Sequence, residues 1–157
     1  MNKTYLSIYN NLIKLTRNKK LYLNLDKQDT FSDRLIFLFF HFAFFLKVYK
    51  KEVDKNEIQK IFDFVIRQIE ISIREIGYGD VSVNKKMKEF LNLLYSIINK
   101  IEVWEVNKSL SNYHIIKNFL NSEKNLDFFT DYFEKYYVFL TKNTLNTFTK
   151  DIINFKF

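Results

Sequence analysis

The chain of 157 residues carries 25 Lys and Arg against 18 Asp and Glu, which gives a formal net charge of +7. Its apolar fraction of 47% is sufficient for a buried core and too high for a disordered chain. The absence of Cys excludes disulfides, thiolate chemistry and cysteine-based zinc sites. The positive charge favours an anionic partner, such as RNA, an anionic membrane face or an acidic protein.

The N-terminal segment lacks the apolar run that a signal peptide needs, because Asn10, Asn11 and Lys14 interrupt it. The longest uncharged run, residues 35–46, is far shorter than the roughly 20 residues that cross a bilayer. We therefore expect a soluble, cytoplasmic protein, with peripheral contact to the inner face of the membrane as an open alternative.

The first helix is expected over residues 4–16, where Leu6, Tyr9 and Ile13 share one face. Residues 21–25 then alternate between apolar and polar positions as a short strand does, but no second strand is available to pair with them. We interpret these residues as an extended connection.

The second helix opens at Thr30, a good N-cap residue, with Asp33 close to the capping-box position. Its body, residues 35–46, is apolar on every side, which is typical of a helix at the centre of a bundle. The alternative is that the excess apolar surface forms an exposed groove for a client.

A third helix is expected to start after Asp54, with Glu57 at capping-box spacing. Apolar residues recur at intervals of three and four from Ile58 to Ile76, which makes this the clearest helical pattern in the chain.

Both glycines of the chain follow directly, and the chain has no Pro. We expect Gly77 to close the third helix in the left-handed conformation. Gly79 is expected to allow a second unusual backbone angle or a close approach by another element. Ser82 is the predicted N-cap of a fourth helix that begins at Val83.

The fourth helix carries Lys85, Lys86 and Lys88 in its early turns, where positive charge is unfavourable near a helix N-terminus. Further helices are expected over residues 110–120 and 129–140, and from 144 to about 155. The sequence therefore predicts an all-α, single-domain bundle of six or seven helices over residues 1–157.

Catalytic and metal-binding motifs do not stand out. His41 and His114 lie in neither of the motifs that hold zinc or two iron ions. The chain also offers no glycine-rich phosphate loop and no nucleophile elbow. We therefore expect no enzyme activity, no cofactor and no metal.

Arg34 and His41 are seven residues apart, and so lie on one face of the apolar second helix. A buried Arg needs a carboxylate and a buried His needs a partner for each ring nitrogen. We predict a polar cluster in which Glu75 and Asp80 supply these partners. The alternative is that Arg34 and Glu75 are separately solvated.

Three sequence blocks carry a family resemblance. Residues 74–87 read Arg-Glu-Ile-Gly-Tyr-Gly-Asp-Val-Ser-Val-Asn-Lys-Lys-Met, residues 29–34 read Asp-Thr-Phe-Ser-Asp-Arg ahead of Leu35 and His41, and residues 59–63 read Gln-Lys-Ile-Phe-Asp. In this order and spacing they resemble the ubiquinol–cytochrome c chaperone family. The resemblance covers about residues 29–104, and leaves an N-terminal arm, 1–28, and C-terminal helices, 105–157, outside it.

The resemblance implies that the positions matching the family motifs form the client or partner site: Arg34, His41, Arg74, Glu75, Gly77, Gly79, Asp80, Lys85 and Lys86. Two departures weaken the match. Asn84 stands where the family usually has Gly, and Ser96-Ile97 stands where Gly-Arg is usual. The second departure removes a basic residue and puts any partner contact there in doubt.

The resemblance implies an assembly chaperone for the cytochrome bc complex, the ubiquinol–cytochrome c oxidoreductase. Its client would be newly made cytochrome b or the nascent chain, and the ribosome, a membrane surface and a small partner protein would be further contacts. Two alternatives stay open. The positive charge also fits a ribosome- or RNA-binding helical module without a chaperone role, and a ligand in an interior pocket would favour a small-molecule enzyme.

Overall fold

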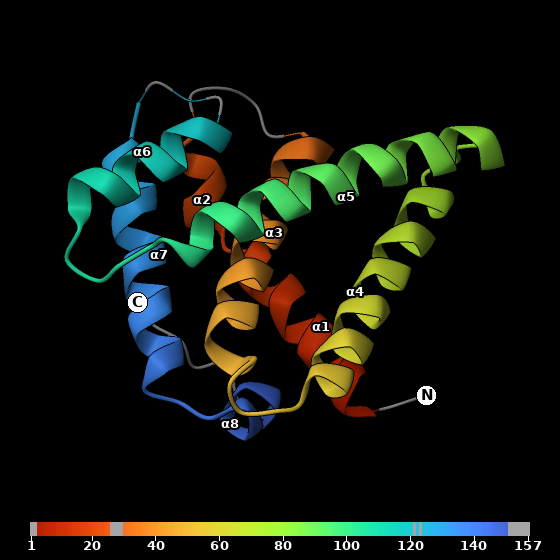
Figure 1. Cartoon of the computed structure of the whole chain (residues 1–157). Helices are drawn as coiled ribbons and strands as arrows, with labels where there is room; N and C mark the ends of the chain where they lie inside the picture. The colour runs from red at the N-terminus through yellow and green to blue at the C-terminus, as the bar shows by residue number, and fades with distance from the viewer. Residues whose placement is uncertain (1–2, 26–29, 121, 123, 151–157) are drawn as a thin grey trace.

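α-Helices are the only regular elements among the residues that the structure, a computed structural model, describes: 3–25, 30–120, 122 and 124–150 (Figure 1). They are α1 Lys3–Thr16, α2 Lys19–Leu23, α3 Phe31–Tyr49, α4 Lys55–Glu75, α5 Asp80–Glu102, α6 Ser109–Phe119, α7 Leu126–Thr141 and α8 Leu145–Lys150. The all-α prediction is confirmed. Seven of these helices coincide with predicted ones, and α2 is additional.

The central helix is α3, which packs against α1, α5 and α7. Its start is fixed by a capping box: the Thr30 hydroxyl accepts from the Asp33 N–H at 3.2 Å, and the Asp33 carboxylate accepts from the Thr30 N–H at 2.9 Å. Of residues 35–46, all except Ile36 are buried. The buried-core interpretation of this apolar segment is therefore confirmed.

The α4–α5 hairpin carries one apolar stripe on each helix. The Asp54 carboxylate caps α4 by accepting from the Glu57 N–H at 2.8 Å, as predicted. The Glu57 carboxylate does not close the capping box and instead accepts from the Tyr5 hydroxyl at 2.6 Å, which ties α4 to α1. Figure 1 shows α4 and α5 meeting at a projecting end of the molecule, on the side away from α6 and α7.

Polar contacts hold the C-terminal helices on α1 and α3. The Asn11 amide of α1 donates to the Phe148 carbonyl of α8 at 2.7 Å. The Tyr49 hydroxyl of α3 donates to the Leu140 carbonyl at 3.3 Å, at the end of α7. Because these donors are buried, the bonds also satisfy groups that would otherwise be costly to bury.

Two local predictions are wrong. The extended connection over residues 21–25 is largely the short helix α2, in which Leu21 is buried and Leu23 is exposed. Ser82 does not cap the fourth helix, because α5 already begins at Asp80, with Gly79 as its N-cap residue. The residues beyond 150 in the last predicted helix lie outside the described part of the chain.

Candidate functional site

A cleft of about 730 Å³ lies between α1, α2, the start of α3 and the C-terminal half of α4. Its walls are apolar side chains from three of these helices: Ile13, Leu35, Leu38 and Ile69. At its edge Leu23 is 81% exposed and Phe31 is 37% exposed. Leu35, Leu38 and Ile69 are themselves buried, so the apolar surface that a partner can reach comes chiefly from Leu23 and Phe31.

Charge at the cleft is of one sign among the described lining residues, which include Arg17, Lys19 and Arg34 and no Asp or Glu. The hydroxyls of Tyr9 and Tyr22 add polar groups to the wall. Tyr22 donates to the Thr16 carbonyl at 2.6 Å, and burial raises the pKa of Tyr9. The Tyr9 phenol is therefore neutral at physiological pH, and the cleft combines apolar walls with a cationic rim.

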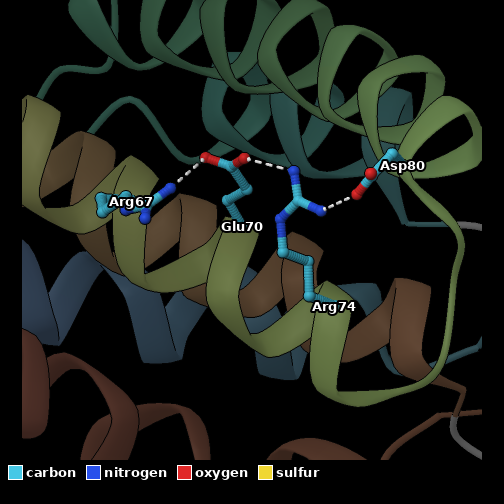
Figure 2. A network of polar contacts seen from close by, with 4 residues as sticks. All are labelled: Arg67, Glu70, Arg74 and Asp80. Carbon is cyan, nitrogen blue, oxygen red and sulfur yellow. Dashed lines mark hydrogen bonds and ion pairs between the residues drawn. The ribbon is translucent and has the colours of Figure 1, made fainter.

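The turn between α4 and α5 is held by a chain of ion pairs, which we call the Arg74 network (Figure 2). The Arg74 guanidinium binds the Asp80 carboxylate at 2.5 Å and the Glu70 carboxylate at 3.2 Å. Arg67 also binds Glu70, at 3.2 Å. The hydrogen bond from Arg74 lowers the pKa of Glu70, which therefore stays ionised. The network joins the last turns of α4 to the first turn of α5.

Gly77 has the positive φ expected of it, +106°, and its N–H donates to the Arg74 carbonyl at 3.0 Å. The expectation for Gly79 is wrong. Its φ is −70°, and a side chain at this position would meet nothing within 4 Å. Only the first of the two glycines is therefore needed for backbone geometry.

The three lysines at the start of α5 differ in their exposure to solvent. Lys85 and Lys88 are exposed, whereas Lys86 is half-buried and lies 3.7 Å from the Glu89 carboxylate in the same helix. None of them lines the cleft. Apart from His41, the predicted site residues thus fall into two groups, with Arg34 at the cleft and residues 74–86 at the α4–α5 end.

His41 belongs to neither group, because it is completely buried in α3. Its Nδ1 lies 2.7 Å from the Phe37 carbonyl and its Nε2 lies 2.7 Å from the Tyr132 hydroxyl. The carbonyl can only accept, so Nδ1 carries the proton and Nε2 accepts from Tyr132. The Tyr136 hydroxyl donates to the His41 carbonyl at 2.9 Å, and the three residues tie α3 to α7.

The predicted cluster of Arg34, His41, Glu75 and Asp80 is therefore wrong. Both nitrogens of the His41 ring have partners elsewhere, and Asp80 binds Arg74. Arg34 and Glu75 are both exposed. The seven-residue spacing does place Arg34 and His41 on one face of α3, but Arg34 lies near the start of the helix and is exposed.

Several structural partners carry no sequence signal. Tyr132 looks like one more apolar-stripe residue of α7, yet it supplies the hydroxyl that bonds His41. The Lys47 ammonium donates to the carbonyls of Ile101, Glu102 and Trp104, at 2.9, 2.9 and 2.6 Å, at the C-terminus of α5.

Two negative findings concern the described residues alone. No helix among them is both long and apolar enough to span a bilayer. No group of three His, Asp or Glu side chains within them could hold a metal ion.

Comparison with known proteins identifies a family and a solved structure that this chain resembles. The family model described as ubiquinol–cytochrome C chaperone matches residues 24–103, just over half of the sequence. A search of curated proteins finds no match. The crystal structure of the Cbp3 homolog from Brucella abortus aligns with a TM-score of 0.70 at 17% identity, covering 98% of this chain and 92% of that chain. At this identity the structural likeness establishes a shared fold, while the family match establishes that the chain belongs to the ubiquinol–cytochrome c chaperone family.

Proposed function

We propose that this protein is an assembly chaperone for the cytochrome bc complex and that its client is newly made cytochrome b. The family match supports the chaperone role. The observation that carries the rest is the cleft, which combines apolar walls with a cationic rim next to α3. Cytochrome b is a membrane protein, so its helices expose apolar side chains until they are inserted.

The cleft suits a short apolar stretch of such a helix rather than a whole transmembrane segment. A volume of about 730 Å³ accommodates a few apolar side chains, which on a helix would be spaced by three and four residues. Burying each large apolar side chain contributes about 1.5–3 kcal/mol to binding. Two or three such side chains therefore give stable but reversible binding. Binding of this kind needs no reacting group, and we propose that the protein acts without catalysis.

We further propose that the cations at the rim orient the client. The C-terminal end of a helix carries partial negative charge, which Arg17, Lys19 and Arg34 would attract. Arg34 is the member of this set that also matches the family motif. Since Arg34 is exposed, Arg34→Ala is expected to weaken client binding while the melting temperature stays within a few degrees of wild type.

The test replaces Leu23, which is 81% exposed at the cleft, with Asp. The matched control is Leu110→Asp on α6, at a side chain that is 73% exposed and outside the cleft. In cells that depend on this chain, we expect Leu23→Asp to lower the amount of cytochrome b severalfold and Leu110→Asp to leave it unchanged. Equal cytochrome b levels in both variants would overturn the assignment of the cleft.

The same cells distinguish the competing RNA-binding function. A ribosome- or RNA-binding module without a chaperone role would bind RNA with an affinity that falls steeply with salt. Its loss would also leave the stability of completed cytochrome b unaffected. We expect the opposite pattern, in which cytochrome b made without this chain is degraded.

A further inference from the structure

The end of the α4–α5 hairpin exposes three apolar side chains within six residues, and we call these the apex: Ile76, Tyr78 and Val81. Their exposed fractions are 54%, 41% and 85%. Single exposed apolar residues are common on soluble proteins, whereas these three lie close together in the sequence at a projecting end of the molecule (Figure 1). None of the three lines the cleft.

Side-chain ion pairs bridge the turn at the apex. The Arg74 network joins both helices across the turn, with the Arg74–Asp80 contact at 2.5 Å (Figure 2). Gly77 closes α4 at φ +106°, and α5 starts three residues later. The exposure of the three apolar side chains is thus a property of an ordered turn that ion pairs support.

Positive charge flanks the apex on α5. Val81, Lys85 and Lys88 are spaced by four and three residues, so one face of the helix carries an apolar end followed by two exposed lysines. Residues 74–88 contain four basic and two acidic side chains. One of the acidic groups, Asp80, is paired with Arg74, while Glu75 is exposed.

We propose that the apex docks on an anionic lipid surface. The apolar side chains would enter the boundary between headgroups and acyl chains, where the ring and hydroxyl of Tyr78 are both accommodated. Lys85 and Lys88 would lie among the lipid phosphates. The proposal concerns side chains that do not line the cleft, because the lining of the cleft on α4 ends at Ser72, about one helical turn before Ile76.

A lipid surface fits this shape better than a protein does. A stable protein interface buries about 800 Å² on each partner, with a packed apolar centre. Three side chains at a convex end offer much less, whereas interfacial insertion needs only a few apolar groups together with nearby cations. The charge around the apex selects an anionic bilayer over a neutral one.

Because the chain has no Cys, a single introduced Cys can be labelled at a chosen position. We would attach a polarity-sensitive fluorophore to Val81→Cys and, as control, to Leu110→Cys on α6. With vesicles of phosphatidylglycerol and phosphatidylcholine, the label at 81 should shift to shorter wavelength and the label at 110 should not. With phosphatidylcholine alone, neither label should respond.

Absence of a shift at 81, or an equal shift at 110, would overturn the proposal. A label at 81 that responds to a membrane-free extract and not to vesicles would assign the apex to a protein partner, which also overturns it.

The lysines provide a second, independent readout. In vesicle sedimentation, Lys85→Gln/Lys88→Gln should weaken binding to phosphatidylglycerol vesicles by about fivefold for each lysine. The control pair Lys117→Gln/Lys142→Gln removes the same charge from exposed positions on α6 and after α7. Equal weakening by both pairs would show that only net charge matters, and the apex would then have no role.

Discussion

His41 illustrates at the residue scale how burial decides the chemistry of a side chain. The imidazole is fully buried between α3 and α7, and burial lowers its pKa from 6.5 to about 4. It is therefore neutral at physiological pH, donates to Phe37 and accepts from Tyr132. A neutral, fully hydrogen-bonded ring serves the packing of the two helices and offers nothing to a client.

This environment predicts a pH dependence of stability. Between pH 6.5 and 4 the unfolded chain protonates His41 and the folded chain does not, so the free energy of unfolding falls as the pH falls through this range. The loss of unfolding free energy that is due to His41 reaches about 3 kcal/mol near pH 4. Denaturant unfolding should show a steeper decline for wild type than for His41→Phe.

The control is His114→Phe, because His114 is exposed on α6. Its replacement should leave the dependence of the unfolding free energy on pH as it is in wild type. If the free energies of unfolding of wild type and His41→Phe fall in parallel from pH 6.5 to 4, the buried neutral histidine is not the cause of the pH dependence.

The two glycines predict opposite outcomes for the same substitution. Gly77→Ser forces a side chain into φ +106° and should cost about 1–3 kcal/mol. Gly79→Ser adds a capping side chain at φ −70° and ψ 164°, and should be neutral or stabilising by a few tenths of a kcal/mol. Thermal unfolding of both variants provides the comparison. Equal destabilisation would mean that the turn has a different conformation.

Helix ends are the features of individual elements that could be read best from the sequence. Thr30 and Asp54 begin α3 and α4 as predicted, because a capping side chain acts within three residues of its own position. The start of α5 differs from the prediction because its N-cap residue is Gly79, which has no side chain to signal a cap. The short α2 was missed because five residues are too few to distinguish alternation from one helical turn.

The C-terminus of α5 depends on a residue of another helix. The Lys47 ammonium donates to three carbonyls there and lies 5.1 Å from the centre of the Tyr137 ring. Lys47→Met keeps the length of the side chain and loses these bonds, so we expect a loss of about 2 kcal/mol in the free energy of unfolding.

Lys50→Met is the matched control, three residues along the chain. Its ammonium makes an exposed ion pair with Glu102 at 2.6 Å, which contributes at most about 1 kcal/mol. Denaturant unfolding measures both variants. If Lys50→Met loses more unfolding free energy than Lys47→Met, the C-terminus of α5 does not depend on Lys47.

For the whole molecule, periodicity identified which residues are buried, but could not show which gap between helices stays open. The cleft combines residues from Tyr9 to Ser72, and no spacing within one helix indicates that these faces diverge. The polar cluster failed for the same reason, since the hydroxyl that bonds His41 lies 91 residues away on α7. The family motifs include Arg34, which lines the cleft, and residues 74–86, which lie at the hairpin end, and spacing in the sequence does not place the two segments relative to each other.

The central claim is that the cleft holds cytochrome b, and site-specific photocrosslinking tests it most directly. A photoreactive residue would replace Leu23 at the cleft or, as control, Leu110 on α6, in cells that are synthesising cytochrome b. We predict an adduct with newly made cytochrome b at position 23 and none at 110. No adduct at position 23, or adducts of equal yield at both positions, would contradict the assignment.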